Sequence, residues 1–88
     1  MATKELEKVF KVLANRRRLA ILKYLKKNRE ASVGEIASEI KLSFKATSKH
    51  LRILAGLDIV ERNQRDLQAF YSLSDLQRPV VKYTLSIL

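Results

Sequence analysis

The sequence predicts a mainly α-helical domain with one small β-hairpin, as a single unit spanning residues 1–88. Three observations predict this fold class. Apolar residues recur at the three- and four-residue spacing of amphipathic helices up to residue 57. Between residues 67 and 73 an apolar residue stands at every second position (Leu67, Ala69, Tyr71 and Leu73), as in a β-strand. With two glycines, one proline and no linker-like stretch, the chain offers no boundary between domains.

Two amphipathic helices are expected first, at residues 3–14 and 16–28. In the first helix, apolar residues at i, i+3, i+4 and i+7 share one face, namely Leu6, Val9, Phe10 and Leu13. Asn15 can cap the second helix, because its side-chain oxygen can accept a hydrogen bond from a free backbone N–H of the first turn. The apolar face of that helix carries Leu19, Leu22 and Leu25.

A pair of shorter helices should follow. Ser32 and Glu35 have the spacing of a capping box, which begins a helix at 33–40. After a brief connection, Ser43 can cap a fourth helix at 44–57. At about 100° per residue this helix has two unlike faces. The inward face carries Thr47, Leu51 and Leu54. The opposite face is cationic, with no acidic residue between 40 and 57, and carries Lys45, Ser48, Lys49 and Arg52.

The remaining elements are a hairpin across residues 59–73 and a terminal helix at 79–88. The hairpin tip is expected at Asn63 to Asp66, since both residues tolerate tight turns. Pro79 suits the first position of the last helix. That helix is apolar on almost every side, which favours coverage by a partner subunit. The alternative is that it packs on its own domain.

Composition narrows the chemistry. Lysine and arginine number 18 against 9 acidic residues, a net charge of +9 that favours nucleic acid first and an anionic membrane surface second. Zero cysteines and one histidine exclude disulfides, thiolate metal sites and most acid–base mechanisms. No nucleophile–base pair and no phosphate-binding glycine loop is present, so we expect no enzyme, no cofactor and no metal ion. No apolar signal segment or membrane span is present, which predicts a cytoplasmic protein without a membrane partner.

A short helix, a brief connection, a basic-faced helix and a hairpin together form a helix-turn-helix followed by a wing. The fourth helix would enter the major groove of double-stranded DNA, where Lys49 or Arg52 can reach a guanine edge and other cations contact phosphate. The wing would contact the adjacent backbone or minor groove. The expected DNA-binding residues are Ser43, Phe44, Lys45, Ser48, Lys49, Arg52, Arg62, Asn63, Gln64 and Arg65.

Three segments match a known pattern, at Val12–Leu22, at Leu42-Ser43 with Ser48–Leu54, and at Phe70–Leu73. They resemble the opening "LADPTRLRIL" segment, the "LSxxxxSxHLxxL" recognition helix and the wing-closing strand of the arsenic-repressor-like (ArsR) winged-helix regulators. The resemblance covers about residues 6–76. It implies a dimeric transcription regulator with dimer contacts from the first and last helices, here Leu6, Phe10, Val81, Leu85 and Leu88.

Several positions depart from that pattern. Asp58 stands where the family usually has a glycine, and aspartate can adopt the same left-handed conformation at some cost. Arg16 replaces a proline. The cysteines and histidines through which many members sense metals are absent from the third and last helices, so metal sensing does not carry over.

Arg16, Arg17 and Arg18 occupy the first turn of a helix, where the macrodipole disfavours each cation by about 0.3–1 kcal/mol at low ionic strength. Arg18 matches a family position and is expected to be structural. Arg16 and Arg17 would then contact a phosphate or an acidic partner, unless they merely extend into solvent. His50 is expected to lie beside the core rather than on a base.

These observations favour a sequence-specific DNA-binding regulator, a dimeric repressor that reads an inverted-repeat operator with recognition helices about 34 Å apart. Two alternatives remain. One is a winged-helix module that binds an acidic protein, and the other is a nonspecific, chromatin-like or RNA-binding protein.

Overall fold

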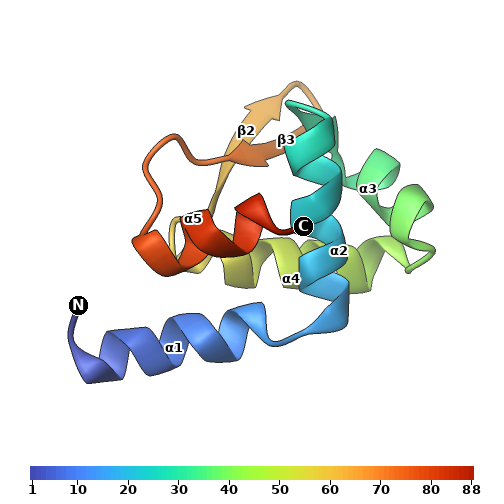
Figure 1. Ribbon diagram of the computed structural model, residues 1–88. Helices are drawn as coiled ribbons and strands as arrows, with labels where there is room; N and C mark the ends of the chain where they lie inside the picture. Colours follow the sequence, from blue (N-terminus) through green and yellow to red (C-terminus); the bar gives the residue numbers. More distant parts are fainter.

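The computed structural model describes residues 1–88 and has five helices and three strands (Figure 1). In chain order they are α1 (Thr3–Leu13), α2 (Arg16–Lys27), β1 (Ala31–Ser32), α3 (Val33–Ile40), α4 (Phe44–Gly56), β2 (Val60–Arg65), β3 (Gln68–Leu73) and α5 (Pro79–Ser86). The mainly helical architecture with a small hairpin agrees with the sequence. The last helix ends at Ser86, two residues before the predicted end.

Local side chains begin three of the helices, as their sequence patterns indicate. The Asn15 side chain accepts a hydrogen bond from the Arg18 backbone N–H at 3.0 Å. Ser32 and Glu35 form a complete capping box at the start of α3. The Ser43 hydroxyl accepts from the Ala46 backbone N–H at 3.1 Å. Because each cap satisfies a backbone donor that the helix itself leaves free, the helix starts are set locally.

The sheet is antiparallel, with strand order β1-β3-β2. The two-residue strand β1 was not expected, because a stretch so short carries no alternation. It forms where Ala31 pairs with Tyr71 and Ser32 with Phe70. This pairing joins β3 to the start of α3, so the base of the hairpin is held against the helical body.

The hairpin tip predicted at Asn63 to Asp66 is wrong. Arg65 pairs with Gln68, and the turn consists of Asp66 and Leu67 alone. Asp66 has a φ of 52°, which suits the two-residue turns that match the twist of paired strands. Asn63 and Gln64 therefore belong to β2. Asp58 also has a positive φ, 58°, in line with its expected left-handed conformation.

One hydrophobic core joins all the helices except the outer ends of α1 and α5. Its fully buried side chains include Val9, Ile21, Leu22, Ile36, Leu51, Leu54, Ile59 and Val81. Helix α5 packs on this core through Val81, with Leu85 and Leu88 half-buried beside it. Val81 has no surface left for another subunit, which removes it from the predicted dimer interface. Tyr83 and Ile87 remain 68% and 66% exposed.

Candidate nucleic-acid interface

Helix α4 has one buried face and one cationic face. Thr47, Leu51 and Leu54 are buried against the core. This packing fixes the rotation of the helix about its axis, so the opposite side chains must face solvent. That face carries Lys45, Lys49 and Arg52, all exposed, together with the half-buried Ser48. Such a face suits a polyanion because every ionisable group on it is cationic.

A cleft of about 400 Å³ lies between α4 and the hairpin. Val33, Ala69 and Tyr71 line its inner part, and its polar lining comes from both walls, with Ser48 and Arg52 on α4 and Arg62 and Gln64 on β2. Phe44 and Leu67 complete the lining. The cleft thus joins the cationic face of α4 to one face of the hairpin.

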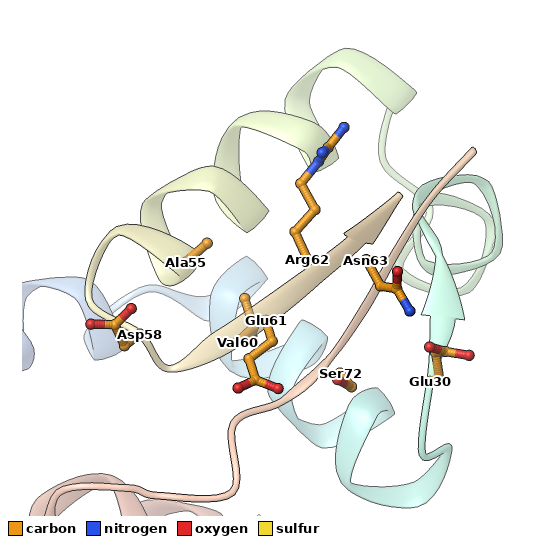
Figure 2. Close-up of a pocket in the computed structure, with 8 residues that line it drawn as sticks. All are labelled: Glu30, Ala55, Asp58, Val60, Glu61, Arg62, Asn63 and Ser72. Carbon is orange, nitrogen blue, oxygen red and sulfur yellow. The ribbon is translucent and has the colours of Figure 1, made fainter. Parts of the chain in front are cut away.

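Within this cleft, Arg62 is held in place by its neighbours. A guanidinium N–H of Arg62 donates to the side-chain oxygen of Gln64, and the Gln64 amide donates to the Asp66 carbonyl oxygen at 3.0 Å. Figure 2 shows Arg62 directed toward α4. No carboxylate pairs with Arg62, so its charge is available to a ligand.

The other two predicted wing residues face away from α4, because successive side chains of a strand point to opposite sides. In Figure 2, Asn63 points to the side of the sheet where Glu30 and Ser72 lie. Arg65 forms an ion pair with Glu30, and its guanidinium lies 4.7 Å from the centre of the Phe70 ring. This outer face is mixed in charge, and the structure therefore divides the ten predicted DNA-binding residues between two surfaces.

Phe44 and Leu67 are exposed apolar residues at the two rims of the cleft. Phe44, the first residue of α4, is 62% exposed, and Leu67 at the hairpin turn is 98% exposed. The sequence pattern assigned Leu67 to the strand rather than to the turn, so it was missed as a candidate contact. Its exposure follows from the two-residue turn, which only the pairing of Arg65 with Gln68 defines.

The arginines at the start of α2 have different surroundings. Arg16 is exposed, whereas Arg17 donates to the Ile40 carbonyl oxygen at 3.1 Å, beside the turn between α3 and α4. Arg18 is structural: its Nε donates to the Val12 carbonyl oxygen at 2.6 Å, and its Nη1 lies 3.2 Å from Nδ1 of His50.

Half-buried His50 lies beside the core, next to Arg18. Its burial lowers its pKa, and the positive charges of Arg18, Lys49 and Arg17 lower it further. Both effects favour the neutral imidazole over the charged form. Because Arg18 can only donate, Nδ1 must accept and the imidazole proton must lie on Nε2.

No three or more histidine, cysteine, aspartate or glutamate side chains gather closely enough to hold a metal ion. None of the five helices combines the length and apolar character that crossing a membrane requires.

Comparison with known proteins gives a consistent picture. A family model described as "Bacterial regulatory protein, arsR family" matches residues 15–62. The transcriptional activator HlyU of Vibrio cholerae is 41% identical over 69 residues, which cover 78% of this chain and 63% of that protein. The chain thus spans less than two thirds of the length of this curated relative.

Solved structures agree over nearly the whole chain. Reduced HlyU from Vibrio cholerae has a TM-score of 0.81 at 36% identity, covering 98% of this chain and 86% of that chain. NolR from Sinorhizobium fredii has a TM-score of 0.81 at 30% identity, covering 96% and 80%. Mb0332 from Mycobacterium bovis, a homodimeric winged helix-turn-helix DNA-binding domain, has a TM-score of 0.79 at 26% identity, covering 96% and 74%. The winged helix-turn-helix predicted from the sequence is confirmed.

Proposed function

Since the chain belongs to the ArsR family of bacterial regulatory proteins, we propose that it is a transcription regulator that binds double-stranded DNA as a homodimer. The observation that carries the proposal is the cleft in which Ser48 and Arg52 of α4 face Arg62 of the wing, with no acidic residue in its lining. With α4 in the major groove, the wing would lie against the neighbouring phosphate backbone.

The cationic face of α4 and the cleft beside it would together supply base and phosphate contacts. Lys49 and Arg52 are exposed on α4 and long enough to reach guanine O6 and N7. Lys45, Ser43 and Ser48 would contact phosphates, and Phe44 would lie against a thymine methyl group. Arg62 would bind a phosphate of the adjacent backbone, with Gln64 holding its guanidinium.

Asn63 and Arg65 would contact DNA only at the outer edge of the wing. The ion pair of Arg65 with Glu30 is at the surface, with 49% and 34% of the two side chains exposed. Surface pairs contribute only about 0–1 kcal/mol, so a phosphate could displace Glu30. Arg16 and Arg17 lie outside the cleft, and their proposed role is nonspecific attraction of the duplex. The excess charge of the first 30 residues would act in the same way, because ten of them are basic and three acidic.

The proposed dimer interface lies on α1 and α5. Phe10 is 51% exposed on α1, and Leu6, Leu85 and Leu88 are half-buried. Tyr83 and Ile87 add exposed apolar area beside them. A symmetric dimer would present two α4 helices to an inverted repeat, with half-sites about 34–36 Å apart. Repression by occupying the operator is the simplest mode, because competition with polymerase needs no ligand.

Selection from random duplex DNA at about 0.15 M salt, followed by footprinting, tests the proposal. Recovery of an inverted repeat supports it. Equal affinity for all duplexes or for RNA would instead indicate a nonspecific chromatin-like or RNA-binding protein. No binding to nucleic acid would favour a module for an acidic protein partner.

Two lysine variants sharpen this test. Lys49→Ala should weaken the selected site by about 1–3 kcal/mol if Lys49 contacts a base, whereas a phosphate contact would weaken all sequences alike. Lys23→Ala is the matched control, since Lys23 is an exposed lysine of α2 and does not lie on the cationic face of α4. Equal effects of the two substitutions would show that Lys49 does not contact a base.

A further inference from the structure

Helix α1 makes its apolar contacts with the domain mainly through its second half. Val9 and Leu13 are buried in the core, and Leu6 is half-buried. The first half instead borders an open cleft of about 620 Å³, whose lining includes Lys4, Lys8 and, at the end of α4, Leu57. In Figure 1, α1 extends along the lower edge of the molecule. Apolar packing alone thus leaves the direction of α1 weakly determined, because such contacts are not directional.

Two arginines connect α1 to α4, one near each end of α1. Arg78 donates from Nε to a Glu5 carboxylate oxygen at 2.9 Å and from Nη1 to the Leu57 carbonyl oxygen at 2.6 Å. Arg18 donates to the Val12 carbonyl oxygen at 2.6 Å and to the Lys11 carbonyl oxygen at 3.4 Å.

The Arg18 guanidinium also contacts His50 of α4, at 3.2 Å. These two guanidinium groups make every side-chain hydrogen bond between α1 and the rest of the domain. A planar guanidinium holds two acceptors in fixed directions, which a lysine ammonium does not do. Each arginine therefore defines where one end of α1 lies relative to α4.

We propose that Arg18 and Arg78 are positioning residues that set the angle between α1 and α4 and thereby the separation of the two recognition helices in the dimer. This inference rests on the proposed function, in which α1 contributes to the dimer interface and α4 enters the major groove. One added base pair moves a half-site by about 3.4 Å along the duplex. It also rotates the half-site by about 35°, since a turn has 10–10.5 base pairs. A dimer with a rigid α1–α4 angle must therefore discriminate between operator spacings.

The separation of the two α4 helices can be measured directly by pulsed electron–electron distance spectroscopy. The chain has no cysteine, so Gly56→Cys provides a single labelling site at the end of α4. A Cβ at Gly56 meets no atom within 4 Å, so the substitution itself introduces no clash. The inter-subunit distance distribution should be narrow in this background and should broaden or shift when Glu5→Ala is added.

Glu7→Ala is the matched control. Glu7 lies on the same helix and is paired only with Lys11 of α1 itself, at 3.9 Å. The Glu7→Ala substitution should leave the inter-subunit distance distribution unchanged. Arg18→Ala removes contacts with Lys11, Val12 and His50. If this variant does not fold, the distance distributions of Glu5→Ala and Arg78→Ala test the proposal.

The second measurement uses the selected operator with its central spacer lengthened or shortened by one base pair. The unsubstituted protein and Glu7→Ala should each lose about tenfold in affinity, a typical cost of one defect in a site. Glu5→Ala should lose less than about threefold, while its affinity for a single half-site stays unchanged. An effect on folding alone would weaken the half-site as well.

Wild-type distances and wild-type spacer discrimination in Glu5→Ala would overturn the proposal. Broadened distances with unchanged spacer discrimination would also overturn it, because the angle between α1 and α4 would then not determine which operator spacing is bound. A monomeric protein, or one that selects no operator, would contradict the proposed function itself. Relaxed discrimination with wild-type distances would overturn the proposal too, because discrimination would then change without a change in the separation of the α4 helices. Broadened or shifted distances with relaxed discrimination support the assignment.

Discussion

Thr47→Val should stabilise the protein, because the Thr47 hydroxyl is a buried polar group without a partner. Thr47 lies on the core face of α4 and has no exposed surface. Its Oγ1 forms no hydrogen bond. Burying a hydroxyl in this way costs about 1–3 kcal/mol in measured protein variants. Valine has nearly the same shape and helix propensity, so the substitution removes the penalty without opening a cavity.

The expected gain is about 1–2 kcal/mol in the free energy of unfolding. For a domain of this size, each kcal/mol corresponds to about 4–8 °C in Tm, which thermal unfolding followed by circular dichroism resolves easily. DNA affinity should not change, since the Thr47 side chain faces away from the cationic face of α4.

Thr84→Val is the matched control. Thr84 is also helical and half-buried, but its hydroxyl donates to the Val80 carbonyl oxygen at 2.8 Å. This substitution loses a formed hydrogen bond and should be neutral or destabilising. A lower Tm for Thr47→Val would refute the reasoning, because it would mean that the hydroxyl has a partner in the folded protein.

Three further outcomes are expected. The pKa of His50 in the folded protein is lowered from 6.5, so the unfolded chain binds a proton at His50 more readily than the folded chain does. The free energy of unfolding should therefore decrease as pH falls from 6.5 through the lowered pKa. Urea titrations at several pH values should show a weaker pH dependence in His50→Gln, and an equal dependence would contradict this assignment. Arg52→Ala should weaken the selected operator by about 1–3 kcal/mol and Arg29→Ala much less, as measured by fluorescence anisotropy; equal losses would remove Arg52 from the base contacts. Phe10→Asp should convert a dimer into folded monomers in sedimentation, and an unchanged mass would place the interface elsewhere.

Much of the helical part was predictable because its signals are local. The caps at Asn15, Ser32 and Ser43 act on backbone groups within the next three residues. The two faces of α4 follow from helical periodicity once one face is apolar. The cationic candidate residues of α4 were therefore visible without any knowledge of the tertiary structure.

The hairpin was less predictable, since its register depends on pairing between segments. The sequence indicated two strands but placed the turn at residues 63–66. In the structure Asn63 and Arg65 belong to β2 and lie on the face opposite Arg62 and Gln64. Successive side chains of a strand point to opposite faces, so the division of the wing residues is defined only once the turn and the register are known. Strand β1 shows the same limit, because its two residues become a strand only when β3 lies beside them.

By itself, then, the sequence determined the helices, their caps, the cationic face of α4 and the family, because each depends on residues close together in the chain. Tertiary structure decided which wing residues share the cleft with α4, that Val81 belongs to the core, and that Arg78 reaches Glu5 across 73 positions. Such contacts join segments whose spacing carries no periodic signal. They exist only because the core brings α1, α4 and the segment before α5 together.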